Sequence, residues 1–126
     1  MTQIRIIPEI RYRDLKAAVA WFRDQLGFET TFEVPGPGGT PAHVEMRLGS
    51  SYVFLSPYSD EGAFADVKQF LNLIVDDPDG HHARAKAAGA DILIAPTDTP
   101  FGARFYALRD AEDVVWWIST YRPAKS

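Results

Sequence analysis

The side chains that could carry chemistry in this sequence are few, and the most suggestive group combines one histidine with two carboxylates. His43 and Glu45 alternate along an apolar run, which would place both on one face of a strand, where Glu9 could join them. Such a group would offer nitrogen and oxygen lone pairs to a divalent metal ion. No further histidine or carboxylate is placed to complete the set, so the sequence favours other roles for these residues.

The other two histidines, His81 and His82, are neighbours in a segment that predicts a helix. Consecutive helical side chains point about 100° apart, so these two cannot chelate one metal ion together. We therefore expect them on the solvated surface of that helix.

Several kinds of catalysis and binding are excluded by what the sequence lacks. There is no cysteine, which excludes thiolate nucleophiles, disulfides and Cys-ligated metal centres. The sequence contains neither a glycine-rich phosphate loop nor a Gly-x-Ser-x-Gly elbow. The net charge of −4 comes with scattered arginines and lysines rather than a basic stripe, so no nucleic-acid partner is expected.

No targeting or membrane segment is predicted. The stretch from Met1 to Ile10 contains Arg5 and Glu9 and lacks the small-residue cleavage site of a signal peptide. No apolar run approaches the ~20 residues that span a bilayer. We expect a cytoplasmic protein without a membrane partner.

The first half of the chain predicts one strand, one helix and three further strands that would position these side chains. A β-branched alternating run predicts the first strand over 4–12. Asp14 is placed to cap a helix with one apolar stripe, and Gly27 is placed to end it. Further strands are expected over 28–34, 42–48 and 51–56.

The second half repeats this order after a polar, turn-rich linker over 58–67. A strand is expected over 68–75, and Asp77 then caps a helix with Pro78 in its first turn and Gly89 at its end. The last three strands are expected over 91–95, 103–109 and 114–120.

The repetition predicts an α+β fold in which two tandem βαβββ modules, 4–57 and 68–121, form one domain over residues 1–126. One helix for four strands covers one face of a sheet, so the other face of this mixed sheet would curl into a cup. The competing interpretation is a single ferredoxin-like α+β sandwich without a cavity. The matching length and order of the two halves favour the repeat.

Short motifs at both ends of the chain occur in a recognisable order. They are Ile7–Leu15, Ala20–Phe22 and Leu26–Phe28 near the start, and Thr99–Gly102, Arg109–Asp110 and Trp116–Tyr121 near the end. Together they resemble the vicinal-oxygen-chelate superfamily, which includes glyoxalase I, extradiol dioxygenases, fosfomycin-resistance enzymes and bleomycin-resistance proteins. The resemblance implies paired βαβββ modules that form a cupped sheet, usually in dimers. One departure is Asp113, which stands where the family favours a glycine with positive φ.

The resemblance also implies where a metal ion would be held in the enzymes of the family. There, His, Gln or Glu side chains from the first and last strand of each module bind a divalent ion. The matching positions here are Ile7, Phe54, Phe70 and Trp117, and hydrocarbon offers no lone pairs to a metal. If the match were shifted by one residue, the only side chain able to bind a metal ion at these positions would be that of Gln69. We therefore expect no metal and no other cofactor.

Strand alternation predicts which side chains would face the cup. For the run 103–109 it gives either Arg104, Tyr106 and Leu108 or the opposite set, and the sequence does not decide between them. The candidate ligand-binding residues, with Arg104 and Tyr106 included, are Ile7, Glu9, Arg11, Tyr52, Phe54, Phe70, Asn72, Arg104, Tyr106 and Trp117.

These residues predict an aromatic-lined cleft that suits a flat, partly apolar molecule. The leading hypothesis is a metal-independent small-molecule binding protein of the bleomycin-resistance type, which would give antibiotic resistance by sequestering its ligand. The alternative is a metal-dependent lyase, isomerase or dioxygenase of the glyoxalase kind. A metal-free enzyme with Glu9 as general base, and Arg11 or Tyr106 stabilising an oxyanion, is also open.

A third hypothesis is a structural or regulatory domain whose partner is another protein. In that case Phe54, Phe70 and Trp117 would fill the core instead of lining a pocket. For assembly we expect a homodimer, with the modules pairing within one chain or swapping between two. Trp21 lies off the apolar stripe of its helix, so it is a candidate anchor in the dimer interface.

Overall fold

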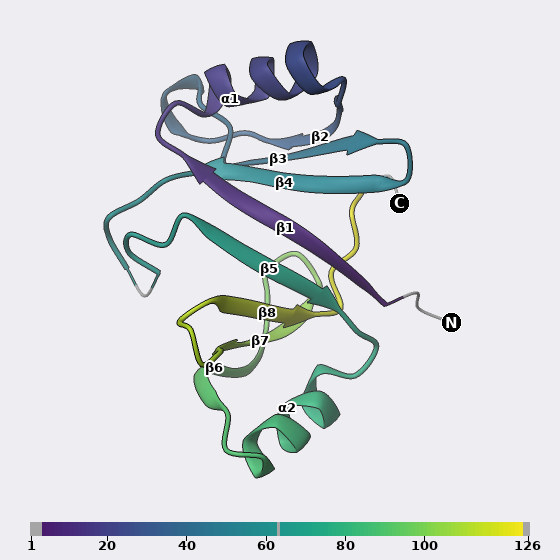
Figure 1. The fold of residues 1–126 in the computed structure, drawn as a ribbon, viewed down its shortest axis with the longest axis vertical. Helices are drawn as coiled ribbons and strands as arrows, with labels where there is room; N and C mark the ends of the chain where they lie inside the picture. Colours follow the sequence, from purple (N-terminus) through teal and green to yellow (C-terminus); the bar gives the residue numbers. More distant parts are fainter. Residues whose placement is uncertain (1–3, 63, 125–126) are drawn as a thin grey trace. The chain divides into compact units, whose positions relative to one another are not determined.

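The computed structural model describes residues 4–62 and 64–124, which form a βαβββ arrangement twice in succession (Figure 1). The strands are β1 (Arg5–Tyr12), β2 (Glu29–Val34), β3 (His43–Leu48), β4 (Ser51–Pro57), β5 (Gln69–Ile74), β6 (Asp91–Asp98), β7 (Arg104–Arg109) and β8 (Val115–Ser119), and the α-helices are α1 (Leu15–Trp21) and α2 (Pro78–Ala87). The predicted mixed α+β class is confirmed. No helix in the described part of the chain is long and apolar enough to cross a membrane.

The described residues divide into two compact units by their internal contacts. The N-terminal unit contains 8–62 and 64–69 together with 123–124, and the C-terminal unit contains 4–7 together with 70–122. The boundary therefore passes through β1 between Ile7 and Pro8. The predicted modules, 4–57 and 68–121, differ from these units at both ends of the chain.

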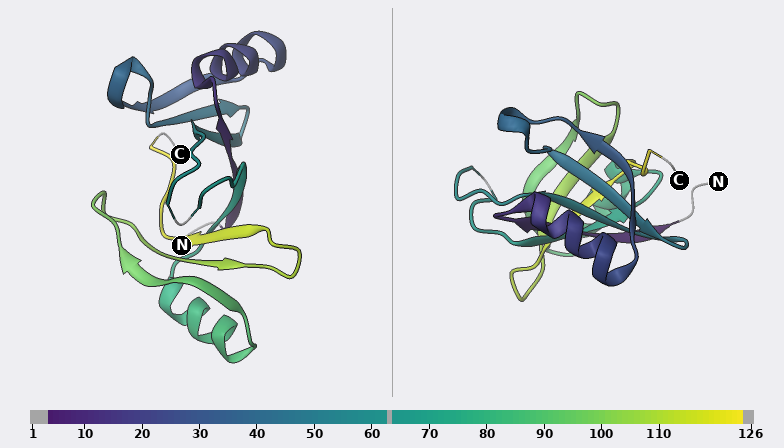
Figure 2. Two further views of the ribbon diagram at one scale, coloured as in Figure 1. Left: turned by 90° about the vertical axis from the view of Figure 1, so that its left-hand side faces the viewer. Right: turned by 90° about the horizontal axis from the view of Figure 1, so that it is seen from above.

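In the N-terminal unit the strands lie in the order β2-β3-β4-β1. The pairs β2–β3 and β3–β4 are antiparallel, whereas β1 runs parallel to β4 with Glu9 opposite Phe54. Helix α1 lies on one face of these strands (Figure 1, Figure 2). The apolar core beneath it consists of Leu15, Phe22, Val44, Met46, Val53 and Leu55. Because side chains alternate along a strand, the residues between these core positions lie on the opposite, helix-free face.

Helix α1 begins and ends where the sequence predicts. The carboxylate of Asp14 accepts a hydrogen bond from the backbone N–H of Ala17 at 3.1 Å, as an N-cap does. The last five residues of the helical segment, Phe22–Leu26 (η1), form a π-helical turn. Gly27 follows with a φ of 83°, which closes the helix in the left-handed conformation that glycine adopts without strain.

The C-terminal unit repeats the arrangement with the strand order β5-β8-β7-β6. Strand β5 runs parallel to β8 with Asn72 opposite Trp117, and the pairs β7–β8 and β6–β7 are antiparallel. Asn72 and Trp117 thus correspond to Glu9 and Phe54 of the other unit. Helix α2 packs on β6 and β7, over a core of Val75, Tyr106 and Ile118.

Strand β6 extends to Asp98, beyond the predicted end at residue 95, and passes through Pro96. Proline has no N–H to donate to a strand ladder, so it is tolerated only at the edge of a sheet or at an irregularity. Both conditions are met, because β6 is the last strand of its unit and its register with β7 shifts between Ile94 and Thr97.

The turn between β7 and β8 adopts the conformation that the sequence predicts. Asp113 has a φ of 67°, one of two non-glycine residues with positive φ in the described part of the chain. The carboxylate of Asp110 accepts hydrogen bonds from the backbone N–H groups of Glu112 and Val114, both at 3.0 Å. The side chain of Asp110 therefore stabilises the turn, and Asp113 adopts the positive φ that the turn requires.

We predict that Asp113→Gly stabilises the protein by about 0.5–1 kcal/mol, because glycine removes the steric cost of positive φ. The ion pair of Asp113 with Arg109, at 4.0 Å on the surface, contributes little to stability. Urea denaturation measures the difference. Glu112→Gly, at a neighbouring position without positive φ, is the control and should not stabilise. Equal unfolding midpoints for Asp113→Gly and the unsubstituted protein would contradict the prediction.

Candidate ligand-binding site

The predicted site residues of the C-terminal unit are divided between the two faces of its strands. Phe70, Asn72 and Trp117 lie on the helix-free face, because their neighbours Leu73, Trp116 and Ile118 pack under α2. Ile7 is buried in the same unit, at the end of the short stretch of β1 that belongs to it. Four of the predicted residues are thus brought together in one unit.

The centre of this helix-free face is a group of three aromatic rings. Trp117 on β8 stacks on Phe105 of β7, with ring centroids 4.4 Å apart and planes within 10° of parallel. Phe70 on β5 is 6.0 Å from Trp117. Phe105 is missing from the predicted set, because it belongs to the opposite alternation of β7. Phe70 and Phe105 are buried, so the three rings form a packed aromatic cluster on this side of the strands.

Asn72 and Ile7 are joined directly. The side-chain amide of Asn72 donates to the backbone carbonyl of Ile7 at 2.9 Å, and both residues are buried. This bond holds β5 beside the first residues of β1. Asn72 therefore has a structural role beside the aromatic group. Its contact with a ligand stays a prediction.

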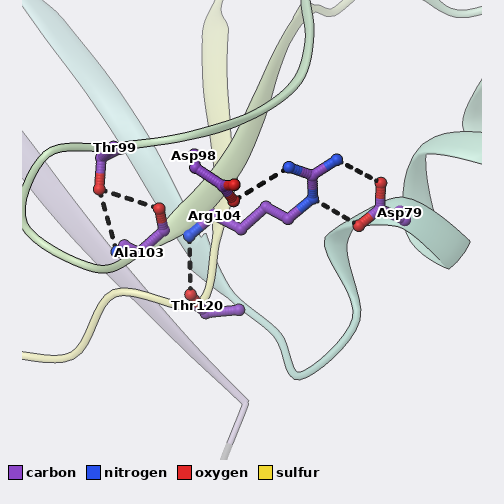
Figure 3. A network of polar contacts seen from close by, with 6 residues as sticks. All are labelled: Asp79, Asp98, Thr99, Ala103, Arg104 and Thr120. Atoms are coloured by element: carbon purple, nitrogen blue, oxygen red, sulfur yellow. Dashed lines mark hydrogen bonds and ion pairs between the residues drawn. The ribbon is translucent and has the colours of Figure 1, made fainter.

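Arg104 lies on the helix-covered face of β7, so the predicted placement of this side chain in the cup is corrected. Its guanidinium donates two hydrogen bonds to Asp79 of α2, at 2.7 and 2.9 Å, and one to Asp98 at 3.0 Å (Figure 3). These carboxylates raise the pKa of Arg104 above its usual value, and Arg104 lowers that of Asp79. Arg104 therefore fastens the first turn of α2 to the sheet.

Tyr106 also faces α2, which corrects the predicted placement of its side chain in the cup. The ring is fully buried, and its hydroxyl lies 2.5 Å from Nδ1 of His81. The ring of His82 meets it edge-on at 5.1 Å. Burial raises the pKa of Tyr106 and lowers that of His81. The two histidines are accordingly partly buried against β7, and not on the solvated surface as predicted.

In the N-terminal unit, Glu9 and Arg11 share the helix-free side of β1 but make different contacts. The carboxylate of Glu9 accepts a hydrogen bond from the hydroxyl of Ser56 at 3.0 Å. The guanidinium of Arg11 donates to the backbone carbonyls of Phe64 at 2.6 Å and Val67 at 2.9 Å. Arg11 thus ties the segment after β4 to β1, a long-range contact that the sequence pattern does not reveal.

The histidine and carboxylate that the sequence singles out on β3 form a pair in which Glu45 is buried and His43 is partly exposed. Glu45 is 0% exposed; its carboxyl group lies 2.8 Å from Nε2 of His43 and accepts a hydrogen bond from the backbone N–H of Ala124 at 2.9 Å. The ring of His43 lies 5.0 Å from that of Phe54, edge-on. Tyr52, the remaining predicted residue of this unit, is buried on β4.

The residues present do not fit a metal ion. In the register of the strands, Phe54 of β4 stands between Glu9 of β1 and Glu45 of β3. Within residues 4–62 and 64–124, no three His, Cys, Asp or Glu side chains gather as a metal site would require. The positions at which the sequence resemblance implies ligands carry Ile7, Phe54, Phe70 and Trp117, whose side chains are poor ligands for a divalent ion.

One protein-family model matches this chain. The model of the Glyoxalase/Bleomycin resistance protein/Dioxygenase superfamily matches residues 4–118. A member of that superfamily from Vibrio splendidus 12B01 has a similar fold, with a TM-score of 0.76, 18% identity, and coverage of 93% of this chain and 98% of the other. The comparison with curated protein sequences gives no match.

Two further solved structures share the fold at low sequence identity. A hypothetical protein from Bacillus halodurans C-125 has a TM-score of 0.75 and 16% identity, with 97% of each chain covered. The methylmalonyl-CoA epimerase of Streptomyces coelicolor, solved with 2-nitronate-propionyl-CoA, has a TM-score of 0.71 and 21% identity, with coverage of 93% of this chain and 96% of the epimerase. At these identities the likeness establishes the fold alone.

We predict that the protein loses stability as the pH falls from about 8 to about 5, and that His81 causes part of this loss. The pKa of His81 is lowered in the folded state, so its contribution is fully present above the unfolded value of about 6.5. This contribution is lost as the pH falls through that value toward the folded pKa. Urea denaturation across this pH range measures the loss.

The matched variants are His81→Gln and His82→Gln. The first should flatten the pH dependence, because it removes the group that must be protonated against burial and the nearby charge of Arg84. The second should retain the dependence. A pH profile for His81→Gln that coincides with that of the unsubstituted protein would show the assignment to be wrong.

Proposed function

This chain belongs to the Glyoxalase/Bleomycin resistance protein/Dioxygenase superfamily, and we propose that within it the protein binds an aromatic or partly apolar small molecule without a metal ion. The main support for the proposal is that apolar and aromatic residues occupy the four positions at which the family resemblance implies metal ligands. Ile7, Phe54, Phe70 and Trp117 have no lone pairs suited to a divalent ion. All four instead carry apolar or aromatic side chains, the residue types that line sites for apolar ligands.

The aromatic group of the C-terminal unit supports this ligand class. Trp117, Phe105 and Phe70 come from three strands of one sheet, so backbone hydrogen bonds hold the strands that carry the rings. A rigid aromatic surface binds a planar ligand with little loss of side-chain entropy. Sequestration of such a ligand requires only affinity, which agrees with the bleomycin-resistance branch of the family name. A homodimer remains part of the proposal, with the exposed Trp21 as an interface residue.

We predict that a planar aromatic ligand changes the fluorescence of Trp117. Titration with a panel of planar aromatic compounds should quench or shift the emission of the unsubstituted protein. Trp116→Phe is the matched control, because Trp116 is the adjacent residue but packs under α2, and it should keep the response. Trp117→Phe should lose it. If no compound in an extensive panel changes the emission, ligand binding on this face is contradicted.

Metal analysis separates this proposal from the metal-dependent lyase, isomerase or dioxygenase. We expect the purified protein to contain less than stoichiometric divalent metal, and its ligand affinity to be unchanged by a chelator. Elemental analysis by mass spectrometry, followed by ligand titration with and without chelator, measures both quantities. A stoichiometric divalent ion whose removal abolishes binding or turnover would favour the enzyme instead.

A further inference from the structure

Helix α2 begins with an Asp–Gly step, a sequence at which peptide chains readily rearrange. Asp79 and Gly80 lie in the first turn, after the N-cap Asp77. Glycine has no side chain to hinder its backbone nitrogen, which is therefore free to attack the carboxyl carbon of a preceding aspartate. The sequence contains this Asp–Gly pair once. The chain thus has one place at which the sequence favours the reaction.

The rearrangement needs no co-reactant other than water. The nitrogen of Gly80 forms a bond to Cγ of Asp79, and its proton leaves with the carboxyl hydroxyl as water, which closes a succinimide ring. Water then adds to one of the two ring carbonyls. Opening at Cγ restores aspartate, whereas opening at the main-chain carbonyl gives isoaspartate, in which the chain runs through Cγ. The rearranged backbone is longer by one methylene group.

The N-cap of α2 favours glycine at position 80 and also binds its N–H. Oδ1 of Asp77 accepts a hydrogen bond from the Gly80 N–H at 3.0 Å. A Cβ at residue 80 would clash with Oδ2 of Asp77. The compact cap therefore favours the residue that makes the Asp–Gly step reactive, and it holds the nitrogen that would react.

The carboxylate of Asp79 is held by Arg104 of β7 (Figure 3). Nε and Nη2 of Arg104 donate to its two oxygens, at 2.7 and 2.9 Å. These bonds lower the pKa of Asp79 and so keep its carboxyl group ionised at neutral pH. Ring closure expels the carboxyl hydroxyl, so the neutral acid is the reactive form. Arg104 is itself positioned by Asp98 of β6, at 3.0 Å.

The helical backbone of α2 is the third restraint, and it is the weakest. Ring closure brings the nitrogen of Gly80 against the side chain of Asp79, so the first turn must leave the helical conformation. Among the ten residues of α2 only Pro78 is buried, while Ala85 packs against the core beneath. An element with so few apolar contacts opens locally before the whole unit unfolds.

We propose that Asp79–Gly80 is a site of isoaspartate formation which Asp77 and Arg104 protect, and that rearrangement there releases α2 from the sheet. In the isoaspartate form the carboxylate is displaced, and the added methylene group disrupts the hydrogen bonds of the first turn. Arg104 then loses its two bonds to the helix. The attachment of α2 depends thereafter on the contacts of Ala85 with the core and of His81 with Tyr106.

The test incubates the full chain at neutral pH in heavy-oxygen water and follows the peptide that contains Asp79 by mass spectrometry. Each ring opening adds one heavy oxygen, and methylation by protein isoaspartyl methyltransferase measures the isoaspartate fraction. The native protein should be labelled at least about tenfold more slowly than the protein in urea, because only the small open fraction of α2 reacts. Asp79→Glu, which would need a larger ring, is the blank. Equal rates in the native protein and in urea would overturn the protection.

Substitutions of the protecting residues test their roles. Arg104→Gln and Asp77→Ala should each speed the labelling of the folded protein several-fold, because each frees one reacting group. Asp77→Asn keeps an oxygen at the N-cap and should stay within about twofold of the unsubstituted protein. Arg47→Gln, which removes an exposed ion pair with Glu29 in the other unit, is the control for a lost arginine and should not change the rate. Unchanged rates for both Arg104→Gln and Asp77→Ala would show that these contacts do not protect the site.

Hydrogen exchange of backbone amides separates release of α2 from global unfolding. In Arg104→Gln the exchange should become faster for the amides of α2 and stay slow for those of β8. The isoaspartate form, separated by ion-exchange chromatography, should show the same selective loss of protection. An isoaspartate form whose α2 amides stay as protected as before would overturn the release of the helix. Equal increases in α2 and β8 would overturn it as well, because the whole unit would then be opening.

Discussion

The alternation of side chains along the strands is the constraint on which the other features depend, because every strand residue lies either under a helix or on the face that the helix leaves uncovered. Phe54 and Val53 are adjacent in the chain, yet Phe54 lies on the helix-free face and Val53 in the core beneath α1. A shift of one residue in register would exchange the two sets completely. The parallel pairs β1–β4 and β5–β8 fix this register in the same way in both units.

The two units repeat one arrangement but attach their helices by different means. Helix α1 packs through large apolar residues such as Leu15, and its π-helical extension adds Phe22. Helix α2, with the sequence PDGHHARAKA, has no large aliphatic side chain after Pro78. Ala85 packs against the core, and polar contacts attach the helix further, namely Arg104 with Asp79 and His81 with the buried Tyr106. Arg104 and Tyr106, which the sequence suggests as ligand-binding residues, therefore attach a helix to the sheet in this structure.

Local chemistry explains which parts of the structure are predictable from the sequence. Caps such as Asp14 act within one turn, so the order of elements follows from short motifs. The face of β7 does not follow, because Phe105 and Tyr106 are adjacent aromatic residues and each alternation contains one of them. The bond from Ala124 to Glu45 joins residues far apart in sequence, and no local pattern marks a backbone N–H as its donor.

Pro96 on the edge strand β6 has a consequence for how copies of this chain can meet. An exposed strand edge offers unpaired N–H and C=O groups to which a strand of another molecule can add, and this addition is a common route to aggregation. Proline interrupts that row of donors, and the nearby register shifts bend the strand out of a flat geometry. The C-terminal unit is thereby protected along this edge against the growth of intermolecular sheets.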